Sequence, residues 1–159
     1  MATAKAKLIE KARQFAALPW RDAGHGIEVL LISSRGTGRW VIPKGWPIKG
    51  FPPHASAARE AFEEAGVGGI IGKGALGQYS YDKQIDGEAS IACDVDVFPL
   101  EVMIQHPSWP EQGQRELARV VTALTAKAPR TRSTVVALYG PGGVGKSALA
   151  AVAGHACGD

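Results

Sequence analysis

Three glutamates in one short segment have the spacing of a metal-binding cluster. Glu60, Glu63 and Glu64 stand at i, i+3 and i+4, so a helix would bring their side chains together on one face. Like charges this close repel each other, and a divalent cation would neutralise them. Coordination by carboxylate oxygens suits Mg²⁺ or Mn²⁺ better than zinc. Arg59 lies beside the cluster and could orient one carboxylate through a forked hydrogen bond. The alternative is the solvated acidic face of a surface helix.

The segment around these glutamates resembles the Nudix box, whose pattern is G-x5-E-x7-R-E-U-x-E-E-x-G-U, where U is a bulky aliphatic residue. The matching positions are Gly45, Arg59, Glu60, Glu63, Glu64, Gly66 and Val67. Two positions depart from the pattern: Phe51 replaces the first glutamate, and Ala61 occupies the first aliphatic position. In the family the metal is held mainly by the later glutamates, which are all present here. The replacement by Phe51 therefore bears on loop geometry or catalytic efficiency more than on metal binding.

The residues before the box resemble one branch of the family. Trp40 to Gly45 read W-x-x-P-K-G, a form similar to the branch that acts on diadenosine polyphosphates and diphosphoinositol polyphosphates. This resemblance implies that Lys44 contacts phosphate and that Gly45 belongs to the substrate-binding loop. Arg39 is a weaker candidate for a phosphate contact, and a solvated cation at a strand edge is an equal interpretation.

The activity that the resemblance implies is hydrolysis of a nucleoside diphosphate linked to another group, or of a related small-molecule pyrophosphate, with Mg²⁺ or Mn²⁺ as cofactor. The cation would offset phosphate charge and lower the pKa of a bound water. The expected catalytic residues are Glu60, Arg59 and Glu63, with Glu60 binding metal or accepting the proton from that water. Which carboxylate is the base stays open. A further metal ligand is expected from the Pro/Gly-broken loop after the last long strand, with Glu111 preferred and Glu116 second.

The pattern of apolar residues predicts several strands, and the resemblance to the Nudix family implies an α/β fold, the Nudix α/β/α sandwich in which a mixed sheet lies between helices. Strands are expected at 14–20, 27–34, 40–42, around Ile70, through Tyr79 and Tyr81, and at 91–102. Asp86 and Gly87 indicate a turn before the last of these. Residues 14–128 would form the Nudix hydrolase domain after a lead-in at 1–13, and 129–159 form an atypical tail.

Composition favours a single globular domain and excludes few functions. The chain has 159 residues, 45% hydrophobic content and a formal charge of +3, a mild excess that favours anionic substrates without predicting nucleic-acid binding. No apolar stretch is long enough to span a bilayer, and two cysteines do not make a disulfide framework. Cys93 is expected in the core. A cytoplasmic location is the default expectation, and the sequence does not indicate an oligomeric state.

The tail carries a second motif. Gly140 to Ser147 read GPGGVGKS, which resembles the phosphate-binding loop of P-loop NTPases, with a strand-like run before it and a helix-like run after it. Only 12 residues follow Ser147, too few for the further strands and the Mg²⁺-binding aspartate of such a domain. Truncation, fusion or a shifted reading frame could each explain the join. Two alternative functions therefore stay open: nucleotide binding by this tail, and a catalytically weak Nudix fold used as a ligand-binding module, which Phe51 would suggest.

Overall fold

The computed structural model describes residues 11–85 and 89–122 of the chain. Their elements are, in order, β1 (Ala12–Asp22), β2 (Ile27–Ser33), β3 (Trp40–Val41), β4 (Lys44–Gly45), α1 (Pro53–Ala65), β5 (Val67–Ile71), β6 (Gly77–Gln84), β7 (Ser90–Gln105) and β8 (Leu117–Thr122). The expected strands are confirmed, with ends that differ by a few residues. The short strand β4 was not expected, because the strand predicted at 40–42 stopped short of it.

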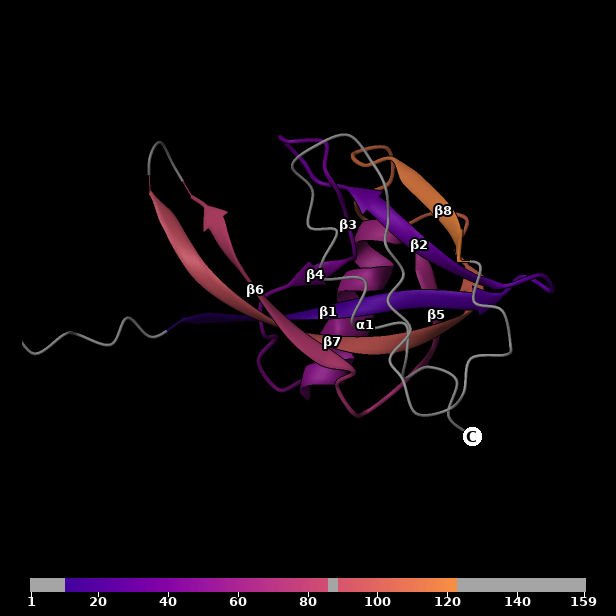
Figure 1. The fold of residues 1–159 in the computed structure, drawn as a ribbon, viewed down its shortest axis with the longest axis horizontal. Coiled ribbons are helices and arrows are strands. Elements are labelled where there is room, and N and C mark those ends of the chain that lie inside the picture. The colour runs from indigo at the N-terminus through magenta and orange to yellow at the C-terminus, as the bar shows by residue number, and fades with distance from the viewer. Residues whose placement is uncertain (1–10, 86–88, 123–159) are drawn as a thin grey trace, which may run out of the picture.

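All the described strands belong to one curved, mixed sheet (Figure 1). β1 and β7 form its centre and run parallel, from the pair Ala12 and Cys93 to the pair Trp20 and Glu101. The far edge of β7 is shared, because its first half pairs with β6 and its second half with β5, both antiparallel. On the other side, the start of β1 pairs with β4 and its end with β2.

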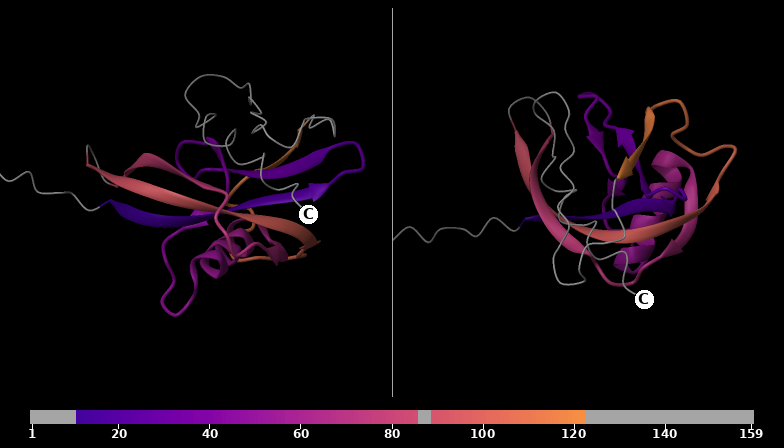
Figure 2. Two further views of the ribbon diagram at one scale, coloured as in Figure 1. Left: turned by 60° about the horizontal axis from the view of Figure 1, so that its bottom comes forward. Right: turned by 45° about the vertical axis from the view of Figure 1, so that its right-hand side comes forward.

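The helix α1 covers one face of this sheet (Figure 2). It carries Ala57, Ala61 and Ala65 at intervals of four, and all three are fully buried in the core between helix and sheet. The small side chain at Ala61, where the box pattern has a bulky aliphatic residue, therefore lies against the sheet and permits a close approach of the helix.

Apolar side chains bury both faces of the sheet. The cluster on the helix side contains Phe15, Ala17, Leu30, Ile32, Ala57, Ala61, Ala65, Val67, Phe98 and Leu100. The second cluster contains Ala16, Leu18, Val29, Leu31, Ile42, Val95 and Val97. Cys93 is buried, as expected. The alternation of neighbours such as Ala16 and Ala17 between the two clusters is the period-two pattern from which the strands were predicted.

Several sequence expectations fall outside the described residues. These are the lead-in before residue 11, the turn at Asp86 and Gly87, and the tail from 123 with its phosphate-loop-like motif. The one helix of the described residues is α1, and none there is long and apolar enough to cross a membrane.

Gly66 ends α1 in a way that only glycine tolerates well. Its φ of 68° is left-handed, and its N–H donates to the carbonyl of Phe62 at 2.9 Å. A Cβ at this position would collide with the ring of Trp109. We expect Gly66→Ala to lower the free energy of unfolding by about 2 kcal/mol or more, because backbone strain and the ring contact add. Chemical denaturation measures this loss.

Gly74→Ala is the matched control for that experiment. Gly74 has no left-handed φ, and a Cβ there would meet nothing within 4 Å. A Gly66→Ala protein as stable as the Gly74→Ala protein would contradict the role assigned to Gly66.

Candidate functional site

The acidic cluster lies where the start of β1, the short strand β4 and α1 meet. Pairing of Lys44 and Gly45 with Ala16 and Phe15 holds β4 against β1. Because the alanine stripe turns one side of α1 to the sheet, the helix presents its glutamates toward β4.

Gly45 makes room for the carboxylate of Glu60. A Cβ on Gly45 would overlap both oxygens of that carboxylate. A glycine is thus required at this position by close packing of the β4 backbone against the Glu60 carboxylate, and not by a left-handed conformation.

Glu64 is the most firmly held member of the cluster. It is buried, with 7% of the residue exposed. The backbone N–H of Lys44 donates to its Oε2 at 3.0 Å, and the guanidinium of Arg115 donates to its Oε1 at 2.5 Å. One carboxylate therefore ties the helix to β4 and to the loop before β8.

Arg115 uses its whole guanidinium in such contacts. Besides Glu64 it donates to Glu111 Oε2 at 2.7 Å and to the carbonyl of Ser33 at 3.1 Å, and only 9% of its side chain is exposed. The N–H of Glu111 in turn donates to the carbonyl of Glu63 at 3.0 Å. The structure therefore brings Glu111 to the cluster, whereas Glu116 is exposed, and the structure shows no contact from its side chain to the cluster.

Of the remaining predicted site residues, Arg59 contacts the cluster and, among the residues that the structure describes, Arg39 does not. Arg59 donates to Glu63 Oε1 at 2.5 Å, so it orients that carboxylate from the neighbouring turn of the helix. Arg39 is exposed in the turn between β2 and β3, and no contact joins it to the cluster in the described part of the chain. Phe51, with 49% of the residue exposed, lies in the loop before α1.

Burial and mutual repulsion shift the protonation of the cluster. Burial, followed by the charges of Glu64, Glu63 and Glu111, raises the pKa of Glu60 to about 7. Burial also raises the pKa of Glu64, although Arg115 opposes that shift. No cation or hydrogen-bond donor among the described residues pairs with the Glu60 carboxylate. The site thus contains a negative charge that its own side chains do not balance.

The donor chemistry fits a divalent cation. The carboxylates of Glu60, Glu63, Glu64 and Glu111 supply only oxygen ligands, which suits Mg²⁺ or Mn²⁺. Within the described residues, no three acids, histidines or cysteines are already arranged around one metal position. Arg59 and Arg115 hold oxygens of Glu63, Glu64 and Glu111 instead, so cation binding would compete with these ion pairs.

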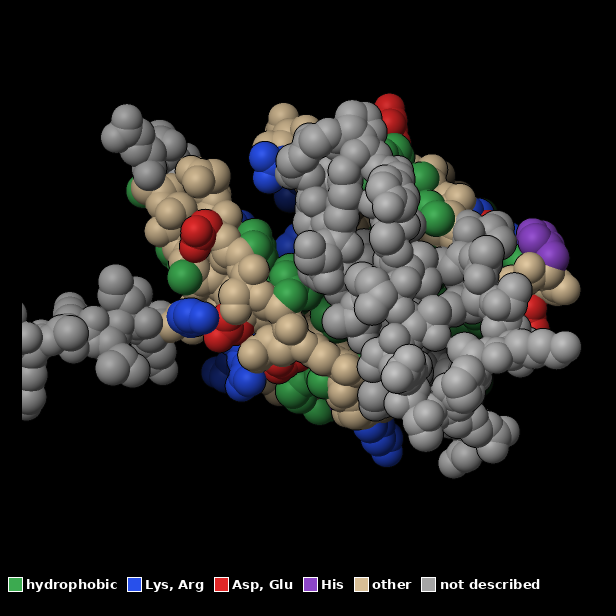
Figure 3. Space-filling view, in the orientation of Figure 1, with side chains coloured by type: hydrophobic (Ala, Val, Ile, Leu, Met, Phe, Trp, Pro, Cys, Tyr) green, Lys and Arg blue, Asp and Glu red, His purple; other side chains and the backbone are tan. Residues whose placement is uncertain are grey.

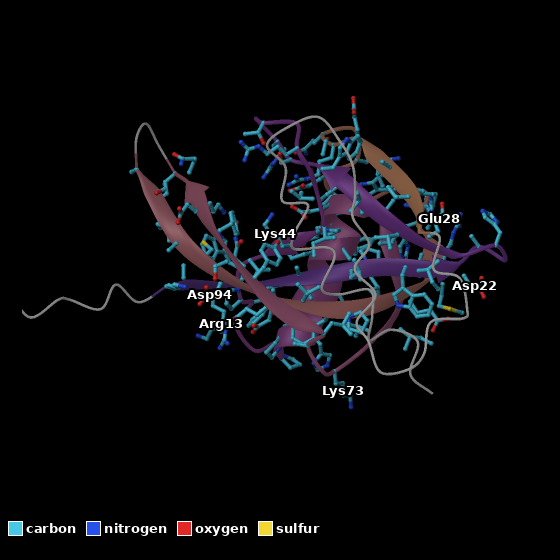
Figure 4. All side chains as sticks on the ribbon, in the orientation of Figure 1. Arg13, Asp22, Glu28, Lys44, Lys73 and Asp94 are labelled. Carbon is cyan, nitrogen blue, oxygen red and sulfur yellow. The ribbon has the colours of Figure 1, made fainter. Side chains whose placement is uncertain are left out.

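Lys44 adjoins the cluster from the other side. Its backbone bonds Glu64, while its ammonium lies 5.1 Å from the centre of the Tyr81 ring. Burial lowers the pKa of this lysine, and the charge of Glu64 opposes the change. Lys44 therefore lies beside β6, the strand that carries Tyr81 (Figure 4).

Two aspartates on β7 do not join the site. Asp94 accepts hydrogen bonds from Ser80 and Lys11, and Asp96 pairs with Arg13 at 3.2 Å and with Gln78 at 2.8 Å. They belong to a polar ladder across the strands, near which Figure 4 labels Arg13 and Asp94.

Arg115 is the member of the candidate site that the sequence interpretation missed. It stands four residues after Glu111, and that spacing was the only local signal for their pairing. Its contacts with Glu64 and Ser33 join residues far apart in the chain, and no local pattern predicts them.

The sheet and the helix that covers it have the arrangement of a Nudix fold. The fold is similar to the NUDIX domain of Shewanella oneidensis NrtR complexed with ADP ribose, with a TM-score of 0.52 at 13% identity over 70% of this chain and 73% of that one. No protein-family model matches the chain.

Sequence similarity agrees with the fold. The chain is 34% identical over 100 residues to Nudix hydrolase 13, mitochondrial, of Arabidopsis thaliana, which covers 60% of this chain and 50% of that protein. It is 49% identical over 47 residues to diphosphoinositol polyphosphate phosphohydrolase 3-beta of Bos taurus, 29% of each chain. In sequence the chain is thus similar to Nudix hydrolases over about 60% of its length. It spans about half the length of the Arabidopsis relatives that it matches.

The pKa of Glu60 predicts how stability depends on pH without metal. The unfolded chain releases this proton near pH 4.5 and the folded protein near 7, so the folded state loses stability as pH rises between these values. We expect Glu60→Gln to be about as stable as the wild type at pH 5 and about 1 kcal/mol more stable at pH 8, a figure reduced for partial exposure.

Urea denaturation in EDTA at the two pH values measures this difference. Mg²⁺ should then stabilise the wild type at pH 8 by binding the folded state, and should stabilise Glu60→Gln less. Parallel pH profiles for the two proteins would show that Glu60 does not retain its proton.

Proposed function

We propose that this domain hydrolyses phosphoric anhydride bonds in a small-molecule substrate with Mg²⁺ or Mn²⁺ on its acidic cluster. The observation that carries the proposal is the unbalanced Glu60 carboxylate, packed against Gly45 among three further carboxylates. A cation bound there would offset phosphate charge and activate water.

The residues of the chain have distinct parts in this proposal. Glu60, Glu63, Glu64 and Glu111 would hold the cation. Arg59 keeps the Glu63 carboxylate in place, and Arg115 does the same for Glu64 and Glu111. Glu60 is also the candidate to accept a proton from the attacking water, because its carboxylate has no competing partner among the described residues. Lys44 and the backbone at Gly45 would contact the substrate phosphate.

The substrate that we favour is a dinucleoside polyphosphate or a diphosphoinositol polyphosphate. The W-x-x-P-K-G sequence supports it, as does the similarity to proteins named diphosphoinositol polyphosphate phosphohydrolase. A cytoplasmic location stays a prediction, and the Arabidopsis relatives are named mitochondrial.

Replacing Glu63 by Gln tests the chemistry. The amide keeps the shape of the side chain but removes a charge that binds the cation, so turnover should fall at least ~10²-fold at saturating Mg²⁺. Chromatography of products from dinucleoside polyphosphates, diphosphoinositol polyphosphates, nucleotide sugars and nucleoside triphosphates provides the measurement. Glu101→Gln, on β7 outside the cluster, should keep wild-type turnover. Equal turnover in both variants would refute the proposal.

Phe51→Glu distinguishes an enzyme from a binding module. The side chain is half exposed in the loop before α1, so glutamate fits there without disturbing the core. If the present cluster is competent, the change should alter turnover by no more than about threefold, since the proposed ligands are untouched. A rise from undetectable to rapid hydrolysis in the same assay would show that the natural chain is a catalytically weak ligand-binding domain.

A further inference from the structure

Beside the acidic cluster, two lysines are held by aromatic rings. Lys83 of β6 lies 4.4 Å from the centre of the Trp46 ring, and Lys44 of β4 lies 5.1 Å from that of Tyr81. Lys44 and Trp46 stand two positions apart on one segment, and Tyr81 and Lys83 stand two positions apart on β6. Each lysine therefore contacts the aromatic ring of the other segment. Tyr81 is itself fixed by a hydrogen bond from its hydroxyl to the buried Gln14 at 2.6 Å.

These contacts position the ammonium groups without neutralising them. In the described residues neither Lys44 nor Lys83 forms an ion pair with an acid, unlike Lys11 or most of the arginines. An aromatic face attracts a cation through its quadrupole and leaves the charge in place. Burial lowers the pKa of Lys44 and the charge of Lys83 adds to that change, while the charge of Glu64 opposes it.

The pair adjoins the site where the cation would bind. The backbone N–H of Lys44 donates to Glu64, so β4 connects the acidic cluster to this pair of lysines. In Figure 3, Lys and Arg side chains appear in the hollow between the β6–β7 hairpin and the rest of the domain, the region where Figure 4 places Lys44. Adjacent regions of opposite charge match a ligand that carries a metal-bound phosphate and further free phosphates.

We propose that Lys83, seated on Trp46, forms with Lys44 a second anion site for the phosphate groups that lie beyond the scissile anhydride. The site would favour substrates that carry further phosphates besides the scissile anhydride, as dinucleoside polyphosphates and diphosphoinositol polyphosphates do, over substrates with a single pyrophosphate. The preference among substrates rests on the proposed hydrolysis, whereas the anion site itself can be tested by binding alone.

In the binding experiment, inorganic tripolyphosphate is titrated into the full chain in EDTA, and calorimetry measures the affinity. We expect Lys83→Met to weaken tripolyphosphate at least fivefold, Lys83→Arg to retain most of the affinity, and Trp46→Leu to weaken it at least twofold because the ammonium loses its platform. Lys73→Met is the matched control: Lys73 is exposed in the loop between β5 and β6, away from Lys44 in Figure 4, and its loss should change nothing.

Lys146→Ala, measured in parallel, accounts for anion binding by the phosphate-loop-like sequence of the tail. Equal affinity in Lys83→Met and Lys73→Met would overturn the inference, as would a tripolyphosphate affinity that depends on Lys146 alone.

Kinetics separate this inference from the proposed function. Lys83→Met should raise KM for a dinucleoside pentaphosphate at least fivefold and KM for ADP-ribose less than twofold, with little change in kcat. Equal changes in both KM values would overturn the inference while leaving hydrolysis intact. A wild type that hydrolyses nothing but binds tripolyphosphate through Lys83 would instead refute the proposed function and keep the anion site.

Discussion

The buried ion pair between Arg115 and Glu64 is the contact on which the site depends. It joins the last turn of α1 to the loop before β8, and Arg115 extends the connection to the end of β2 through Ser33. Removing two charges from water costs free energy that good hydrogen bonds must offset, and here both oxygens of Glu64 and all three nitrogens of Arg115 form one. The guanidinium of Arg115 also keeps Glu64 and Glu111 in fixed positions beside Glu60. One side chain therefore connects elements of the fold and positions the proposed metal ligands.

Close packing of small residues determines how near these charges can come. Ala61 and its neighbours let α1 lie directly on the sheet, and Gly45 lets Glu60 press against a strand backbone. Burial at that contact is the largest cause of the raised pKa of Glu60. An aliphatic residue at Ala61 or any side chain at Gly45 would therefore change the electrostatics of the site through distance, without removing a charged group.

Much of the fold and part of the site were predictable because their signals are local. The period-two alternation predicted β1, β2 and β7, and the box spacing placed Glu60, Glu63 and Glu64 on one helix. β4 was missed because two residues after Pro43 carry no periodic signal. Arg115 and Lys83 were missed because their partners lie on other elements, and only the folded chain brings them together. The roles assigned to the predicted residues remain predictions.

The shared edge of β7 has a consequence for how this domain can vary. β6, which carries Tyr81 and Lys83, and β5, which follows α1, both take their register from the same strand. A single residue inserted in the middle of β7 would turn every later side chain to the opposite face and displace β5 relative to β6. Viable length changes among natural homologues should therefore be confined to the turns, such as 23–26 or 72–76, because changes there leave the pairing of β5 and β6 with β7 intact.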